Sequence, residues 1–303
     1  MKDLRLWLGL MRVDFLYLDV ACVLLGTGAA AWTHGQINPF YLILTFVGAV
    51  CAHVSVNSLN EYGDFKSGLD LLSERTPFSG GSGTLRARPD LALTALGIGV
   101  VSLAITAVIG LYFLLVRGWA LLPLGVIGLL VIVVYTNWIT RLPLVSLIVT
   151  GLGFGLLMVT GTYYVQTGEY SWTAFFASLA PFCLGNDLLL LNQFPDVEVD
   201  RAVGRRNLPI LLGRRASSVI YGLFLLATYL SIVVGIWLGH LPVATSLGLL
   251  TLPLAVSAAV GVYRYAEDVP RLVRSMGFNV LLNITIPTLM AAGLFIAAWA
   301  GWT

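Results

Sequence analysis

Charged residues are scarce in this sequence, and their scarcity excludes an ordinary water-facing surface. Only 11% of the 303 residues are Asp, Glu, Lys or Arg, whereas a soluble globular domain contains about 25%. Lys and Arg number 17 against 15 Asp and Glu, and a net charge of +2 is too small for a nucleic-acid-binding surface. With 58% hydrophobic residues and a mean hydropathy of +0.90, the composition indicates an integral membrane protein with no nucleic-acid partner.

Cysteine is also rare, which excludes a disulfide-stabilised fold. Cys22, Cys51 and Cys183 stand alone in apolar runs, and neither their number nor their spacing suits disulfides or a zinc site. We expect them to pack as small hydrophobic side chains. The apolar run over 15–32, which follows a charged N-terminal segment, is long enough to cross a membrane, so it predicts a retained span and not a cleaved signal peptide.

Long apolar runs recur along the whole chain. A membrane-spanning helix needs about 20 predominantly apolar residues, and runs of about that length predict nine such helices. We therefore predict an all-α fold, a polytopic membrane bundle formed by a single domain over 1–303. The predicted spans are 15–33, 39–59, 91–115, 119–138, 144–164, 172–191, 218–239, 242–263 and 277–299.

The basic residues predict the orientation of this bundle. With the N-terminus placed in the cytoplasm, every Lys and Arg except Arg117 falls in a segment on the cytoplasmic side. Basic connections are retained on that side of cell membranes. The pattern therefore predicts a multi-pass protein of the cytoplasmic membrane with its C-terminus outside.

Acidic residues gather in two of the cytoplasmic connections, the motif loops at about 57–89 and 192–217. Because Asp and Glu contribute little to orientation, this clustering calls for a functional explanation. Each loop contains an Asn followed four residues later by an Asp, namely Asn60 and Asp64 in the first and Asn192 and Asp196 in the second. The two patterns lie 132 residues apart, which predicts two halves related by duplication.

The spacing of the acids favours a metal site. Asn192, Asp196 and Asp200 follow one another at intervals of four residues, which places them along one stripe of a helix. Asp70 follows Asp64 after a glycine, where the chain can turn. Oxygen ligands without nearby His or Cys suit hard cations, and Mg²⁺ typically takes one or two carboxylates together with substrate phosphates. The flanking acids are expected to be solvated and paired with neighbouring arginines: Glu61, Glu74, Asp90 and Glu198.

A Gly- and Ser-rich segment over 73–84 adds groups that can bind an anion. Its backbone N–H groups and hydroxyls can bind phosphate oxygens, and cationic side chains on the same face can neutralise them. Acids that hold Mg²⁺ beside such cations and an apolar bundle predict a site for a diphosphate with a hydrocarbon tail. The predicted diphosphate-binding residues are Lys66, Arg75, Arg141, Arg12 and Arg201.

Three strings in these loops resemble the signatures of the UbiA superfamily of intramembrane prenyltransferases. They are NEYGDFKSGLD over 60–70, RTPFSGGSGTL over 75–85 and NQFPDVEVDRAVG over 192–204. The chain is most similar to the menaquinone (MenA-like) branch, whose first motif has the form Asn-x3-Asp-x5-Asp. MenA-like proteins commonly carry an acidic residue where this chain has Phe154.

The resemblance implies a lipid-open helical bundle in which two Mg²⁺ ions and the diphosphate of an isoprenoid donor bind above a central cavity. The implied activity is transfer of a prenyl group to an aromatic quinone precursor. The implied metal ligands are Asn60, Asp64 and Asp70 for one ion and Asn192, Asp196 and Asp200 for the other.

Capture of the prenyl group requires an acceptor held below the metals. Metal ions and cationic side chains would stabilise the departing diphosphate, and an electron-rich acceptor would capture the allylic cation in a cavity that excludes water. We predict Asp187, an ionisable residue at membrane depth, to be catalytic together with Asp64 and Asp196. His53 is expected to be a packing residue. The predicted acceptor-binding residues are Tyr135, Asn137 and Asn186, with Asn279 and Asn283 as further candidates.

Three other functions are compatible with the same residues. Paired acids and an internal repeat also occur in cation-coupled transporters, although carriers place their acids near the middle of the membrane. A membrane terpene cyclase would use the same metals and capture the cation within the same isoprenoid. Prenyl transfer to a lipid acceptor of the glycerol-phosphate type would use the same donor chemistry.

Overall fold

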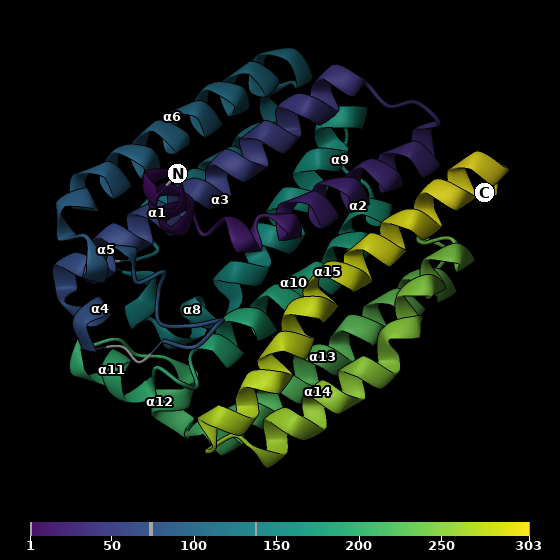
Figure 1. Cartoon of the computed structure of the whole chain (residues 1–303). Helices are drawn as coiled ribbons and strands as arrows, with labels where there is room; N and C mark the ends of the chain where they lie inside the picture. The colour runs from purple at the N-terminus through teal and green to yellow at the C-terminus, as the bar shows by residue number, and fades with distance from the viewer. Residues whose placement is uncertain (1, 73–74, 137, 303) are drawn as a thin grey trace.

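The computed structural model describes residues 2–72, 75–136 and 138–302, with side chains throughout except at 2–5, 70 and 71. Every regular element in these ranges is helical, which confirms the all-α prediction (Figure 1). The longer α-helices are α1 (Lys2–Met11), α2 (Tyr17–His34), α3 (Pro39–Ser67), α6 (Ala92–Arg117), α7 (Leu122–Val134), α8 (Pro143–Gly151), α9 (Thr160–Thr167), α10 (Trp172–Asn192), α13 (Arg214–Trp237), α14 (Leu252–Arg264) and α15 (Val269–Ala300).

The remaining elements are short or irregular. The short α-helices are α4 (Leu69–Leu72), α5 (Thr84–Ala87), α11 (Val197–Ala202) and α12 (Leu208–Leu212). The 3-10 segments are η1 (Val13–Phe15), η2 (Pro89–Leu91), η3 (Trp119–Leu121), η4 (Ile139–Arg141) and η6 (Val243–Thr251), and η5 (Leu152–Val159) is a π-helix.

Eight helical segments in the described part of the chain are long and apolar enough to cross a membrane. The chain is therefore a multi-pass membrane protein, as its composition predicts. The predicted span at 119–138 corresponds to a shorter apolar segment, Trp119–Val134. The last span begins earlier than predicted, because the Asp268 side chain caps α15 by accepting the N–H of Arg271 and Pro270 occupies its first turn.

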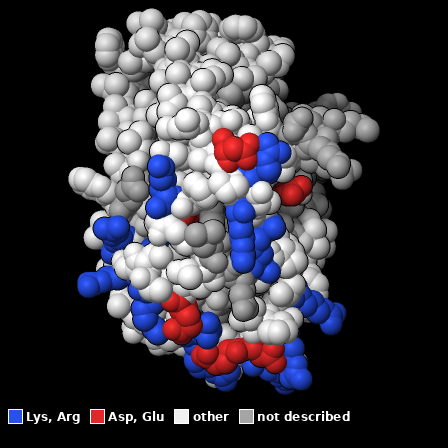
Figure 2. Space-filling view, turned by 60° about the vertical axis from the view of Figure 1, so that its left-hand side comes forward, with Lys and Arg blue, Asp and Glu red and all other residues white. Residues whose placement is uncertain are grey.

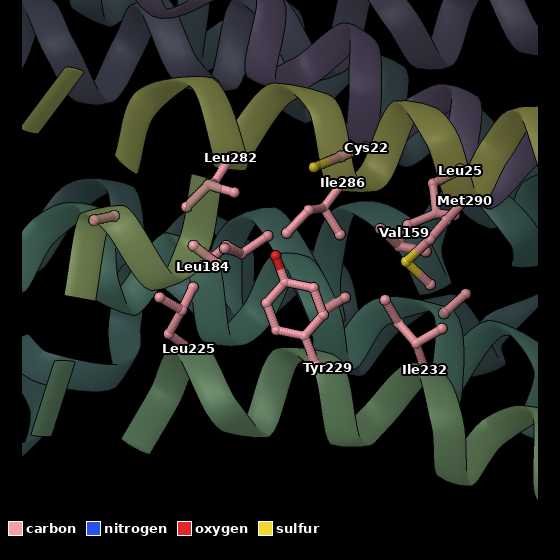
Figure 3. Packing of buried hydrophobic residues seen from close by; sticks show 14 of the residues in the cluster. Cys22, Leu25, Val159, Leu184, Leu225, Tyr229, Ile232, Leu282, Ile286 and Met290 are labelled. Carbon is pink, nitrogen blue, oxygen red and sulfur yellow. The ribbon is translucent and has the colours of Figure 1, made fainter. Parts of the chain in front are cut away.

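The largest buried core lies among α2, α10, α13 and α15. Although α2 and α15 lie near opposite ends of the sequence, they run side by side in the bundle (Figure 1). In the core between these helices, the ring of Tyr229 lies among aliphatic side chains (Figure 3). A close approach at Gly155 of η5 extends this packing to α10, because a Cβ at that position would lie 2.5 Å from backbone atoms of Ser178 and Phe182.

The helices α3 and α6 are much less buried than this core. Only 17% of the apolar window of α3 is buried, and 22% of that in Pro89–Arg117, against 72% for α10. The two helices pack against each other. Their inner sides, together with α7, η5 and α9, line an internal space.

The short helices α4, α5, α11 and α12 lie together at one end of the bundle, where α3 and α10 also finish (Figure 1). Figure 2 turns this end forward and shows acidic and basic side chains gathered over the lower part of the face, while the upper part is uncharged. The two motif loops therefore lie where the charged side chains of this face gather.

Candidate active site

The first motif is presented by one uninterrupted helix. Asn60 and Asp64 are one turn apart on α3, so both lie on the same face, as their spacing predicts. The helix ends where Gly68 adopts a left-handed conformation with φ of 79°. This is the turn that the sequence predicts before Asp70.

The structure corrects the prediction that Glu61 is solvated. Its side chain is fully buried because the segment that carries Ser82 folds over the end of α3. The carboxylate accepts hydrogen bonds from Arg12 at 2.7 Å and from the N–H and hydroxyl of Ser82 at 2.9 and 2.7 Å. The Arg12 guanidinium also reaches the side-chain oxygen of Asn60 at 3.4 Å. Glu61 therefore holds a cation beside the first motif.

Two other flanking acids are exposed, as predicted. Asp90 accepts two hydrogen bonds from Arg88, at 2.8 and 2.7 Å, and Glu198 pairs with Arg201 at 2.9 Å. Glu74 lies outside the described residues. All three acids pair with an arginine, but Glu61 differs from the other two because it is buried and also accepts two hydrogen bonds from Ser82.

The second motif is not a continuous helical stripe, and here the prediction is wrong. The helix α10 ends at Asn192, and the chain turns over 193–196 before α11 begins. Pro195 accounts for the break, because proline lacks an N–H and disfavours helical backbone at the preceding residue. Asp196 and Asp200 still lie on consecutive turns, since the N–H of Asp200 donates to the Asp196 carbonyl at 2.8 Å.

Arg205 joins the two motifs. Its guanidinium donates to Oδ1 of Asp64 on α3 and, at 3.2 Å, to Oδ1 of Asp200 on α11. Nδ2 of Asn207 donates to the other oxygen of Asp200 at 2.8 Å. Acids that are far apart in the sequence thus converge on one cation.

A polar pocket of about 130 Å³ lies between the motif acids. Five of the six predicted metal ligands line it, and the side chain of the sixth, Asp70, is not among those that the structure describes. The Asp196 carboxylate accepts no hydrogen bond from any described residue, so it is open to a ligand. The five oxygen-bearing side chains are Asn60, Asp64, Asn192, Asp196 and Asp200.

The charges of this pocket suit a cation. Burial, together with the neighbouring Asp200, raises the pKa of Asp196 to about 7. Burial also raises the pKa of Asp200, although Arg205 opposes this effect. Burial disfavours the charged form of Arg205, but the carboxylates of Asp64 and Asp200 outweigh it and raise the pKa of the guanidinium. Carboxylates that share so little water are stabilised in their ionised form by a bound cation, and their oxygens fit Mg²⁺.

A second cavity, of about 580 Å³, adjoins the polar pocket and extends into the apolar part of the molecule. Its wall consists mainly of aliphatic side chains from α3, α6, α7 and η5. Arg12, Asn60, Tyr135 and Asn192 line both spaces. The arrangement therefore offers one polar end and one long apolar body, which is the shape of a site for a charged head with a hydrocarbon tail.

One wall of the apolar cavity carries a histidine. His53 lines the cavity, with its side chain 9% exposed, and the edge of its ring meets Phe154 with the ring centroids 5.1 Å apart. Phe154 is the residue at which the chain departs from the MenA-like pattern. His53 is packed, as predicted, but it also faces the space in which a substrate would lie.

Most of the predicted diphosphate-binding cations lie outside these two spaces. Arg12 lines both, whereas Arg201 pairs with Glu198 on the solvent side of α11. The four predicted cations that are exposed and line neither space are Lys66, Arg75, Arg141 and Arg201.

The predicted acceptor-binding residues divide in the same way. Tyr135 lines both spaces, whereas Asn137 is outside the described residues. Asn186 is fully buried, and its side-chain oxygen accepts the N–H of Gly151 at 2.7 Å, next to the start of the π-helix. The carboxyl oxygens of Asp187 are buried without a hydrogen-bond partner among the described residues. The predicted residues that line neither space are Asn186, Asp187, Asn279 and Asn283.

Sequence reasoning missed Arg205 and Asn207. Both follow Asp200 within seven residues, after Gly204, which has a φ of 80° and turns the chain back toward the motif. Gly204 was a partial signal in the sequence, because glycine permits a sharp turn directly after the acidic motif. The sequence does not show which of the neighbouring arginines points inward.

Comparisons with known proteins identify the family. The profile of the UbiA prenyltransferase family matches residues 20–282. A 1,4-dihydroxy-2-naphthoate octaprenyltransferase from Mycobacterium leprae is 28% identical over 289 residues, which cover 93% of this chain and 94% of the relative. UbiA prenyltransferase domain-containing protein 1 from Homo sapiens is 29% identical over 281 residues, covering 90% of this chain and 76% of the relative.

The fold agrees with a solved structure of the same family. A UbiA homolog from Archaeoglobus fulgidus bound to GPP and Mg²⁺ has a TM-score of 0.63 to this chain at 14% sequence identity, and the similarity covers 95% of this chain and 99% of that one. With a family match over most of its length, this chain belongs to the UbiA prenyltransferase family and is a membrane-embedded prenyltransferase.

Proposed function

We propose that the chain transfers a prenyl group from an isoprenyl diphosphate to a hydroxylated aromatic acceptor of the dihydroxynaphthoate class. The observation that carries the proposal is the junction of the two spaces: oxygen-bearing side chains of both motifs line a polar pocket that opens into an apolar cavity of about 580 Å³. The acceptor class follows from relatives such as the 1,4-dihydroxy-2-naphthoate octaprenyltransferases.

The polar pocket binds the donor's head in this proposal. Two Mg²⁺ ions, when bound, neutralise the diphosphate and stabilise the charge that develops as it leaves. Asn60 and Asp64, with the predicted ligand Asp70, would hold one ion, and Asn192, Asp196 and Asp200 would hold the other. Arg12 and Arg205 contact the diphosphate, because they are the cationic side chains that line the pocket in the described part of the chain.

Arg205 has a second role at this site. It bridges Asp64 and Asp200, so it keeps acids of the two motifs near each other although they would otherwise repel. A diphosphate offers the guanidinium oxygens of the same kind, and a planar donor fork can bind them in pairs. The other predicted cations are exposed, so they attract the anionic donor to this end of the molecule without contacting it in the pocket. They are Lys66, Arg75, Arg141 and Arg201.

The apolar cavity holds the hydrocarbon tail and the aromatic ring. Its aliphatic wall excludes water, which protects the allylic cation until the ring captures it. Tyr135 lies where the two spaces meet, so its ring and hydroxyl border the carbon that is transferred. Such positioning converts a bimolecular encounter into a step within one complex.

The proposal includes a topology. Nine segments cross the cytoplasmic membrane in a single domain over 1–303, with Trp119–Val134 as the short crossing, the N-terminus in the cytoplasm and two halves related by duplication. The active site then lies near the cytoplasmic face, open to the lipid. The basic connections support this orientation.

The test is a reconstituted reaction in liposomes. Purified protein, a panel of isoprenyl diphosphates and a panel of acceptors are mixed with Mg²⁺ or with EDTA, and released diphosphate and lipid products are measured. We expect Mg²⁺-dependent diphosphate release together with a prenylated aromatic product identified by mass spectrometry. Absence of diphosphate release across the panels contradicts the enzyme assignment and favours a transporter. A cyclic isoprenoid product would instead indicate a terpene cyclase. A prenylated glycerol phosphate would indicate a lipid acceptor in place of the aromatic one.

A further inference from the structure

A histidine–aspartate pair lies in the wall of the apolar cavity. Nδ1 of His53 on α3 lies 3.1 and 3.0 Å from the two carboxyl oxygens of Asp19 on α2. Asp19 is fully buried, so it touches no substrate, whereas His53 lines the cavity. The ring of Phe154 packs edge-on against the imidazole. The imidazole plane is therefore fixed from two sides.

His53 lies on the same stripe of α3 as the first motif. His53, Asn57, Asn60 and Asp64 follow one another along α3 at intervals of four, three and four residues, and such intervals place side chains on one face of a helix. With a rise of about 1.5 Å per residue, His53 lies roughly 10 Å along the axis from Asn60. The aromatic ring of the acceptor captures the allylic cation next to the polar pocket. The edge of that ring that points away from the pocket therefore lies at the depth of His53.

The carboxylate of Asp19 determines which nitrogen of His53 is available. An imidazole that donates its Nδ1 hydrogen to a carboxylate carries no hydrogen on Nε2 when neutral, so Nε2 can accept a proton. Among the described residues that line the apolar cavity, the other titratable side chains are Arg12 and Tyr135. A guanidinium has no proton-accepting nitrogen, and a phenol is already protonated at neutral pH. Among the described residues, His53 is thus the one base that lines the apolar cavity.

Resting on the proposed function, we propose that His53 is the general base of the prenyl transfer and that Asp19 is its positioning residue. The C–O bond of the donor breaks, and its electron pair leaves with the diphosphate. A ring carbon of the acceptor forms the new C–C bond to the prenyl carbon. The hydroxyl proton of the acceptor passes to Nε2 of His53 as that bond forms, leaving a neutral keto tautomer of the prenylated ring. Asp19 stabilises the resulting imidazolium until the proton returns to water.

The experiment separates donor ionisation from prenyl transfer. Wild-type protein and His53→Gln are compared in liposomes with Mg²⁺, a donor and a hydroxylated aromatic acceptor, and both diphosphate and prenylated product are measured in a single turnover. Glutamine keeps hydrogen-bonding groups but cannot act as a base. We expect transfer to fall about 100-fold, as for loss of a general base, while diphosphate release changes less than threefold and prenyl alcohol accumulates.

Two further variants test the assignment of roles. Imidazole added to His53→Ala should restore part of the transfer, which a packing role does not predict. Asp19→Asn preserves the size of the side chain but no longer fixes the tautomer, so transfer should fall about tenfold or more with ionisation intact. The matched control is His34→Gln, which removes an exposed histidine paired with Glu169 and should leave both readings unchanged.

Several outcomes overturn the inference. They are unchanged transfer in His53→Gln, a rise in the acceptor KM with kcat unchanged, and an equal fall of ionisation and transfer. If His53→Gln does not fold in detergent, the same readings on Asp19→Asn decide, and unchanged transfer there overturns the inference. Failure of the proposed function is distinguishable, because it removes prenylated aromatic product from the wild-type reaction itself.

Discussion

The two motifs have the same residue pattern but different structures. Asn60 and Asp64 lie on one continuous helix, and Asp64 bonds to Arg205. Asn192 ends its helix, and Asp196 precedes the next one without a hydrogen bond from any described residue. The first motif thus holds its paired acid on a rigid helix. The second has one acid, Asp200, paired with the same Arg205 and one open carboxylate, Asp196, on a turn.

This difference indicates a division of roles. A helix interior fixes its side chains through the backbone, so the first motif can define one wall of the pocket before any ligand binds. A turn between two helices can adjust its side chains, and burial together with the neighbouring Asp200 raises the pKa of Asp196 to about 7. The four experiments below test this comparison.

The largest effect is expected from removing one acid of each motif. Asp64→Ala and Asp196→Ala should each lower turnover roughly 1,000-fold, because each removes a ligand that neutralises the diphosphate. Their effects on the metal-free protein should differ. Asp64→Ala removes a bond to Arg205 and lowers the melting temperature, whereas Asp196→Ala relieves repulsion from Asp200 and leaves it equal or higher. Thermal melting in EDTA measures the melting temperature of each variant. Equal losses of folded protein in Asp64→Ala and Asp196→Ala would contradict the difference between the two motifs.

The second effect concerns the bridge between the motifs. Arg205→Lys keeps the charge but loses the planar fork that reaches Asp64 and Asp200 together, so turnover should fall about 100-fold. The matched control is Arg206→Lys, since Arg206 is exposed and its backbone N–H bonds to Thr140 whatever its side chain. Steady-state kinetics on both variants measure the difference. Equal activities of the two variants would show that Arg205 is not part of the site.

The third effect compares a glutamate near each motif. Glu61→Gln removes the charge that holds Arg12 and should lower turnover about tenfold and the free energy of unfolding by about 2 kcal/mol, since a hydrogen bond to a charged group contributes 1.5–3 kcal/mol. Glu198→Gln removes an exposed pair and should change activity less than twofold. Thermal melting and kinetics report both quantities. A large loss of activity in Glu198→Gln would contradict the assignment of Glu198 to the solvent side of α11, outside the polar pocket.

The sequence predicted the elements of this molecule better than their contacts. Apolar run length predicted the all-helical bundle and eight of its nine proposed spans, because the lipid environment dictates both. The predicted span at 119–138 is a shorter apolar segment, Trp119–Val134. Asn60 and Asp64 fell on one helical face as their spacing required. The turn at Gly68 was also predictable, because glycine adopts positive φ without steric cost.

The site was predicted less completely, for two physical reasons. Local spacing assumes a continuous helix, and Pro195 interrupts it within the second motif. Burial depends on segments distant in sequence, so Glu61 looked like any loop acid until the segment around Ser82 covered it. The choice of Arg205 over its neighbours follows from the same long-range packing, which no local pattern reveals.

The smallest effect is expected from pH, and it tests the open carboxylate directly. The pKa of Asp196 is raised to about 7, so a proton competes with Mg²⁺ below that pH. Between pH 6 and pH 8 the ionised fraction rises about tenfold, and the affinity for Mg²⁺ should rise by up to the same factor. Titration of Mg²⁺ at pH 6, 7 and 8 measures this, with Glu198→Gln as the control that should show the same dependence.

The metal-free protein should show the opposite trend. A carboxyl whose pKa is higher in the folded protein than in the unfolded chain binds protons more tightly when folded, so its contribution to stability is lost as pH rises from about 4 through 7. In EDTA the melting temperature should therefore be lower at pH 8 than at pH 6, and Asp196→Asn should reduce this difference. Mg²⁺ should restore stability most at pH 8, where the carboxylate is ionised. An Mg²⁺ affinity independent of pH would mean that Asp196 is not a ligand, and that the second motif, like the first, holds its charge neutralised by the protein itself.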